Sequence, residues 1–178
     1  MRQLSSREVY RNPWMVVRED TIERGDGTSG SYGVVDKPDF ALVVPVDRQG
    51  FWMVEQYRYP VRRRAWEFPQ GSWGAGQPGG TAEELARSEL AEETGLRAGL
   101  MRPLGHLFGA YGFCSQGFTV WLAEDLTSGP TGREDSEQDM DHRHVAEPEF
   151  RQMVANGDIV DAATLAAFSL YELDRMAG

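Results

Sequence analysis

The stretch Arg87-Ser-Glu-Leu-Ala-Glu-Glu-Thr-Gly-Leu96 decides how this sequence is interpreted, because it places a helix pattern and three carboxylates together. Upstream, Thr81 is a good N-cap and Glu84 stands three residues later, which makes a capping box. Gly95 stands where a glycine commonly ends a helix. We therefore expect a helix over Thr81–Thr94.

On such a helix, Glu89, Glu92 and Glu93 lie at positions i, i+3 and i+4, so their carboxylates share one face. Carboxylates at this spacing repel one another, and a bound Mg²⁺ would remove that cost because it prefers oxygen ligands. Spacing alone favours a simpler interpretation, in which this is a solvated acidic face. The residues around the helix are needed to choose between them.

Strand patterns surround this helix. Phe40–Val46 is typical of a strand that is buried on both faces, Asp47–Gly50 of a turn, and Phe51–Tyr57 of the hairpin partner of the first strand. Val9–Arg18 is aromatic and β-branched, and glycines mark turns after it. The remaining expected elements are the strands Ala65–Phe68, Leu104–Phe108, Phe118–Leu122 and His142–Val145 and the helices Glu149–Ala155 and Ala162–Leu173.

Strands outnumber helices and do not alternate with them regularly, which predicts an α+β fold, an α/β/α sandwich with a mixed sheet. We expect an N-terminal antiparallel strand segment over residues 1–39 and a main domain over residues 40–178. Such a short strand segment cannot build its own core, so it is predicted to form part of a homodimer.

Composition narrows the classes of partner. The chain has 178 residues with 18 basic and 28 acidic side chains, a formal net charge of -10, which argues against a general nucleic-acid binder. No apolar stretch is long enough to span a bilayer, and the first residues lack the apolar core of a signal peptide. A single cysteine, Cys114, excludes an intramolecular disulfide. These features predict a cytoplasmic protein without membrane partners.

The segment Glu89-Leu-Ala-Glu-Glu-Thr-Gly-Leu96 resembles the second half of the Nudix box, G-x5-E-x7-R-E-U-x-E-E-x-G-U, in which U is a large aliphatic residue. It follows a glycine-rich loop that opens at Phe68-Pro-Gln-Gly71. The resemblance implies that Glu89, Glu92 and Glu93 bind Mg²⁺, with Mn²⁺ as a possible replacement, together with the backbone carbonyl of Gln70.

Two departures from the box stand out. Counted from Gly71, the loop is three residues longer than the consensus, and Gly80 and Ser88 stand where the family has a glutamate and an arginine that usually pair. Arg87 has a substitute partner within reach in Glu83 or Glu84.

Upstream motifs resemble the ADP-ribose pyrophosphatase branch of the family. They are Val54-Glu-Gln-Tyr-Arg58 and Ala65-Trp-Glu-Phe-Pro-Gln-Gly71. This resemblance implies that Arg58 contacts substrate phosphates, that Glu67 lines the site, and that Trp14 stacks on a base. Gln116 replaces an acid in a loop that faces the far end of the substrate in that branch. Core or interface packing remains the simpler role for Trp14, and a solvated side chain is an equal alternative for Arg58.

The general base is expected in the loop Arg133-Glu-Asp-Ser-Glu-Gln-Asp139, because metal would occupy the box carboxylates. Glu137 is the preferred candidate because it leads directly into the strand at His142–Val145, and Glu134 is the second. The three histidines lack a metal-ligand spacing and are interpreted as structural.

These features predict metal-dependent hydrolysis of a nucleoside diphosphate linked to another group, with ADP-ribose giving AMP and ribose 5-phosphate. The alternatives are a pyrophosphatase for nucleotide sugars such as GDP-mannose or UDP-glucose, and a non-catalytic Nudix domain that senses a nucleotide.

Overall fold

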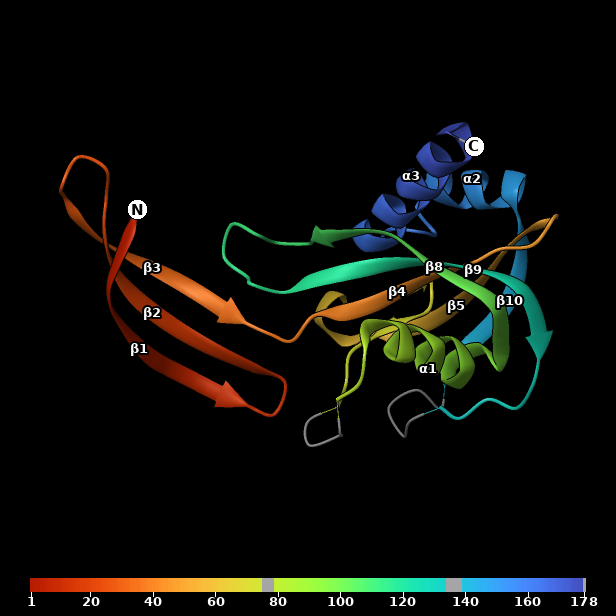
Figure 1. Ribbon diagram of the computed structural model, residues 1–178, viewed down its shortest axis with the longest axis horizontal. Helices are drawn as coiled ribbons and strands as arrows, with labels where there is room; N and C mark the ends of the chain where they lie inside the picture. Colours follow the sequence, from red (N-terminus) through yellow and green to blue (C-terminus); the bar gives the residue numbers. More distant parts are fainter. Residues whose placement is uncertain (75–78, 134–138, 178) are drawn as a thin grey trace.

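A computed structural model describes residues 1–74, 79–133 and 139–177 of the chain. A three-stranded sheet at the N-terminus stands to one side, and a sandwich of two further sheets and three helices forms the rest (Figure 1). This arrangement confirms the expected α+β class with a mixed sheet.

The N-terminal sheet is a simple antiparallel meander of β1 (Arg2–Asn12), β2 (Met15–Glu23) and β3 (Ser29–Asp36). The aromatic and β-branched stretch Val9–Arg18 is divided between β1 and β2, because the chain reverses inside it. Pro13 cannot donate to a strand ladder, and the Asn12 side chain accepts hydrogen bonds from the backbone N–H groups of Trp14 (2.9 Å) and Met15 (2.8 Å). The residues before and after this turn therefore belong to β1 and β2.

The central sheet has the order β7-β4-β9-β8, with β4 (Phe40–Pro45) parallel to β9 (Gly117–Ser128) and the other pairs antiparallel. Its remaining strands are β7 (Gln70–Gly71) and β8 (Leu96–Phe108). Side chains alternate along β4, so Ala41 and Val43 pack against helix α1 (Ala82–Thr94), whereas Leu42 and Val44 join the larger core. The central strand is thus buried on both faces, as expected.

The third sheet has the order β10-β5-β6 and contains β5 (Gly50–Arg58), β6 (Arg63–Glu67) and β10 (Asp141–Ala146); a 3₁₀ turn at Tyr59–Val61 links β5 to β6. The expected hairpin between β4 and β5 is wrong. Strand β4 already has β7 and β9 on its two edges, so β5 meets it only at a bridge between Val46 and Phe51 and then enters the third sheet.

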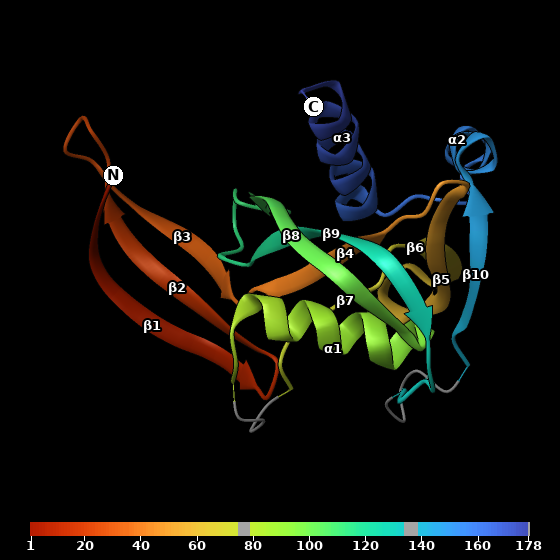
Figure 2. The ribbon, with the colours of Figure 1, turned by 45° about the vertical axis from the view of Figure 1, so that its right-hand side comes forward.

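Helices α1 and α3 (Ala162–Ala177) lie on opposite faces of the central sheet, and α2 (Glu147–Asn156) lies at the end of β10 (Figure 2). The larger core fills the space between α3, α2 and the two sheets. It is dominated by aromatic rings, with Phe51 in contact with Phe68, Phe150, Phe168 and Tyr171 at centroid distances of 5.2–5.8 Å. On the other face, α1 and its smaller core hold the carboxylate segment against the sheet.

Candidate active site

Helix α1 begins and ends where its capping residues predict. The Thr81 hydroxyl accepts a hydrogen bond from the Glu84 N–H (3.2 Å), and the Glu84 carboxylate accepts one from the Thr81 N–H (2.7 Å). Gly95 adopts a left-handed conformation (φ 74°) and donates to the Ala91 carbonyl (3.0 Å). The helix register that puts three glutamates on one face is therefore fixed at both ends.

Strand β7 lies directly against this face. The Gln70 N–H donates to a Glu93 carboxylate oxygen (3.2 Å), and Glu93 is buried. A Cβ atom on Gly71 would lie 2.4 Å from a Glu89 carboxylate oxygen, so this carboxylate comes close to the backbone of β7. Two of the three glutamates therefore meet the short strand whose first carbonyl, that of Gln70, was predicted to share their cation.

The third glutamate is directed elsewhere. The Ser88 hydroxyl donates to the Glu92 carboxylate one helical turn away. Within the described part of the chain, no three Asp, Glu, His or Cys side chains converge on one point. The residue types are nevertheless those that a hard cation takes as ligands, because the carboxylates of Glu89 and Glu93 both lie against β7.

The two departures from the Nudix box are compensated within the loop and the helix. A Cβ on Gly80 would lie 2.7 Å from a Glu84 carboxylate oxygen and 3.0 Å from the Trp73 ring, so neighbouring side chains already fill the space beside it. Trp73 packs against the smaller core under α1. Arg87 pairs with Glu83 (2.9 Å) and donates to the Ala98 carbonyl (2.9 Å). An apolar anchor and a different ion pair thus hold the loop and the helix.

Beside β7, an ion pair between a half-buried arginine and a buried glutamate joins the ends of β5 and β6. Glu67 is 2% exposed and accepts hydrogen bonds from Arg58 and from the Gln56 amide (2.8 Å). Burial raises the pKa of the Glu67 carboxyl, and the charge of Arg58 opposes that shift. Burial alone would lower the pKa of Arg58, but Glu67, Glu93 and Asp161 together raise it. Arg58 therefore stays charged next to the carboxylate helix.

A cavity of about 420 Å³ opens at this ion pair, with Arg58, Glu67, Gln70 and Asp161 among its walls. Asp161 was not predicted. It accepts from the N–H (2.8 Å) and the hydroxyl (2.8 Å) of Thr164 at the start of α3, and from the Gln70 side-chain amide (3.2 Å). The sequence signal for it is an aspartate at a helix start, which by itself indicates only a cap.

The other predicted site residues lie apart from this cavity. Trp14 is 66% exposed at the turn between β1 and β2. Gln116 donates to the Pro38 carbonyl (2.8 Å) at the junction between the N-terminal sheet and the sandwich. The two general-base candidates, Glu137 and Glu134, lie outside the described residues. The three histidines were interpreted as structural. His106 contacts Asp39, His142 contacts Arg133 and His144 contacts Asp47.

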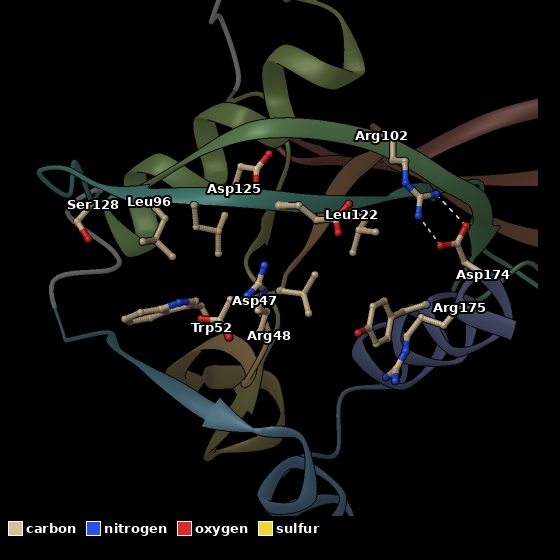
Figure 3. A pocket seen from close by; sticks show the side chains of 14 residues that line it. Asp47, Arg48, Trp52, Leu96, Arg102, Leu122, Asp125, Ser128, Asp174 and Arg175 are labelled. Carbon is tan, nitrogen blue, oxygen red and sulfur yellow. Dashed lines mark hydrogen bonds and ion pairs between the residues drawn. The ribbon is translucent and has the colours of Figure 1, made fainter. Parts of the chain in front are cut away.

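A larger groove, of about 560 Å³, lies at the opposite end of β4 (Figure 3). Trp52 and Leu96 form part of its walls, and Arg102 and Asp174 form an ion pair across its rim (2.8 Å). Of the predicted site residues that the structure describes, none lines this groove. The smaller cavity, by contrast, is lined by Arg58, Glu67 and Gln70, and Gln70 also contacts Glu93 on α1.

Two models of protein families match this sequence. The model of the NUDIX domain matches residues 37–165, which is more than half of the chain, and the model of the nucleoside diphosphate sugar hydrolase N-terminal domain matches residues 1–35. The chain belongs to the Nudix hydrolase family.

Relatives of this Nudix hydrolase include two ADP-ribose pyrophosphatases. The protein from Mycobacterium tuberculosis is 31% identical over 92% of this chain and 79% of its own length. The protein from Bacillus subtilis is 25% identical over 96% of this chain and 91% of its own length. A solved structure of an ADP compounds hydrolase has the same fold, with a TM-score of 0.82, 20% identity, and coverage of 96% of this chain and 91% of that one.

The Nudix assignment makes the chain a hydrolase related to enzymes that split pyrophosphates, and Nudix hydrolases generally use a divalent metal. Over the described ranges, no helix of this Nudix hydrolase has the length and apolarity required to cross a membrane.

Proposed function

We propose that this Nudix hydrolase cleaves ADP-ribose to AMP and ribose 5-phosphate with the help of Mg²⁺. The observation that carries the proposal is the contact between β7 and α1, where Gln70 and Gly71 lie against Glu93 and Glu89. Glu93 is also close enough to Arg58 to raise its pKa, and Gln70 lines the cavity that opens at the Arg58–Glu67 ion pair. The 31% identical relative named an ADP-ribose pyrophosphatase supports the choice of substrate.

Glu89, Glu92, Glu93 and the Gln70 carbonyl would hold the cation. When bound, Mg²⁺ lowers the pKa of water and neutralises charge on phosphate oxygens, which is the chemistry that hydrolysis of a phosphoanhydride needs. The Arg58 guanidinium, which is half-buried and held by Glu67, is suited to bind a diphosphate oxygen and to orient it.

A carboxylate outside the metal set would remove the proton from the attacking water. We assign this role to Glu137, with Glu134 as the alternative. Both belong to the segment between Arg133 and Met140. Arg133 contacts the C-terminal end of α1, and Met140 directly precedes β10.

The proposal includes a homodimer. Strand β1 is exposed along almost its whole length, and Leu4, Val9 and Tyr10 on it are about half-exposed. Exposed apolar side chains on a sheet without its own core are suited to pack against a second copy of the chain. In such a dimer Trp14 is available to stack on a base, and Gln116 to contact the far end of the substrate. A cytoplasmic location, expected from the sequence, is part of the same proposal. Light scattering at micromolar concentration tests the assembly, and a monomer there contradicts it.

Nucleotide sugars are the second candidate substrates, because the N-terminal match is to a nucleoside diphosphate sugar hydrolase domain. The decisive experiment offers ADP-ribose, GDP-mannose and UDP-glucose to the purified protein with Mg²⁺, with Mn²⁺ and with excess EDTA, and identifies products by chromatography. We expect AMP from ADP-ribose at the highest kcat/KM and no product in EDTA. Higher kcat/KM for a nucleotide sugar overturns the substrate assignment, and full activity in EDTA overturns the role of metal.

A further inference from the structure

The C-terminal end of α1 is held by a segment that the Nudix box does not include. After β9 the chain runs past the last turn of the helix, where the Gly129 N–H donates to the Gly95 carbonyl (2.7 Å) and the Gly132 N–H to the Glu92 carbonyl (3.0 Å). Carbonyls in the last turn of a helix have no partners within the helix. This segment therefore supplies donors to a helix end that would otherwise depend on water.

Arg133 completes the arrangement with a side chain. Its Nε and one terminal nitrogen donate to the Glu93 carbonyl (3.2 and 3.1 Å). The same guanidinium donates to the Met140 carbonyl and contacts His142 Nδ1 (2.7 Å). Because guanidinium has five N–H donors in a rigid plane, it is able to join three acceptors from different elements at fixed angles.

We propose that Arg133 is a positioning residue that fixes Glu93 on α1 relative to β10 and thereby sets the geometry of the carboxylate site. The inference rests on the proposed role of Glu93 as a metal ligand. Glu93 is bound at both ends, because its carboxylate accepts from the Gln70 N–H and its backbone carbonyl accepts from Arg133. Met140 is buried and His142 is half-buried on β10, so the guanidinium is attached to a firm part of the sandwich.

The contact with Arg133 requires a particular protonation state of His142. Arginine carries no acceptor, so His142 Nδ1 must be the acceptor and the imidazole must be neutral when the contact forms. Burial lowers the pKa of His142, and the charge of Arg133 lowers it further, which keeps the ring neutral near pH 7. Asparagine, whose side-chain oxygen can accept the same hydrogen bond, is therefore expected to substitute for His142.

The test compares Arg133→Ala, Arg133→Lys and a control, Arg63→Ala. Arg63 also donates to a carbonyl at a helix end, that of Gly157 after α2 (2.8 Å), but it lies on β6 and contacts no carboxylate of α1. Two readouts are used: Mn²⁺ binding by titration calorimetry, and hydrogen exchange of the peptide over residues 90–96 in metal-free protein.

For Arg133→Ala we expect Mn²⁺ affinity to fall by about 10- to 100-fold, as for other residues that orient metal ligands, and exchange over residues 90–96 to accelerate at least about tenfold. Arg133→Lys should recover part of the affinity, because an ammonium group reaches one acceptor but cannot join all three. His142→Asn should bind Mn²⁺ like the wild type, whereas His142→Leu should bind it more weakly.

Wild-type exchange and wild-type Mn²⁺ affinity in Arg133→Ala would overturn the inference, as would equal losses in Arg63→Ala. Should the wild-type protein bind no Mn²⁺, the proposed function fails, and the exchange measurement alone still decides whether Arg133 holds the helix end. Activity adds a third readout: a positioning role predicts a lower kcat for Arg133→Ala with little change in KM.

Discussion

The N-terminal sheet and the sandwich differ in how much they bury. Most charged side chains of the sheet pair across its surface, as in Arg2–Glu23 (3.1 Å) and Arg7–Glu19 (3.0 Å), and its buried residues are Ile22 and Asp20, which pairs with Arg18. In the sandwich, Glu67 and Glu93 are almost fully buried beside aromatic and aliphatic cores. Exposed ion pairs contribute little to stability, whereas buried carboxylates are costly unless a cation or hydrogen-bond donors bind them. The sandwich, which contains the proposed site, is thus built around a large core, whereas the sheet is mostly exposed surface.

The largest expected effect is on turnover and concerns Glu93. Glu93→Gln keeps the size of the side chain but removes the charge that a cation needs, so activity should fall below detection while the fold persists. Steady-state rates with Mg²⁺ and a circular dichroism melt measure the two properties. The matched variant in the N-terminal sheet is Glu19→Gln, which should keep its activity. Rates near wild type in Glu93→Gln would show that burial of a carboxylate does not mark the reactive centre.

A smaller loss is expected for the general base. Glu137→Gln should lower kcat by roughly 10²- to 10⁴-fold with little change in KM, because only proton removal is lost. Glu134→Gln, measured alongside, should be nearly unaffected. A crippled Glu134→Gln enzyme with a full-rate Glu137→Gln enzyme would reverse the assignment, and two full-rate enzymes would move the base out of this segment.

Removal of an apolar side chain should destabilise the sandwich more than the N-terminal sheet. Phe51 is fully buried among four aromatic rings, so Phe51→Ala should cost about 3–5 kcal/mol in the free energy of unfolding. Val9 is 48% exposed on β1, so at protein concentrations low enough to keep the chain monomeric Val9→Ala should change that free energy by no more than about 0.5 kcal/mol. Urea unfolding measures both variants. A cost for Val9→Ala that grows with protein concentration would reveal that a second copy covers β1.

The smallest expected effect is on the pH dependence of stability. Burial lowers the pKa of His142, so the unfolded chain binds the proton first as the pH falls below about 6.5. The free energy of unfolding that the neutral His142 contributes above pH 6.5 is therefore lost as the pH falls toward the lower pKa of the folded state. His142→Asn should therefore lose less unfolding free energy than the wild type between pH 7.5 and 5.5. Arg11→Gln, which removes the exposed Arg11–Glu8 pair (2.6 Å), should follow the wild type. Parallel curves for His142→Asn and wild type would contradict this.

Sequence reasoning succeeded where the signals are local. Thr81, Glu84 and Gly95 define α1 because capping depends only on residues within one turn. The pairing of β5 was missed because it depends on which strands occupy the edges of β4, and these come from distant parts of the chain. The contribution of Trp73 was missed for a related reason, since its partners lie under a helix that begins nine residues later.

The candidate site was predictable to a similar extent. Its carboxylates and Arg58 stand in recognisable motifs, and the described structure brings Glu89, Glu93, Gln70, Arg58 and Glu67 into one neighbourhood. Asp161 and Arg133 reach this neighbourhood only through tertiary structure, and neither stands in a motif. Residues that support a site from another element leave no spacing pattern, so sequence alone could not select them.

The parallel pairing of β4 with β9 also bears on how the chain acquires its structure. Phe40 lies opposite Phe118, about 80 positions later in the sequence. Contacts between such distant segments require the closure of a large loop before they contribute, and proteins rich in them fold slowly. We therefore expect α1, the β1–β3 meander and the β8–β9 hairpin to form early in refolding. The central strand pair, and with it the carboxylate site, would form last, so enzymatic activity should return later than helical signal after dilution from denaturant.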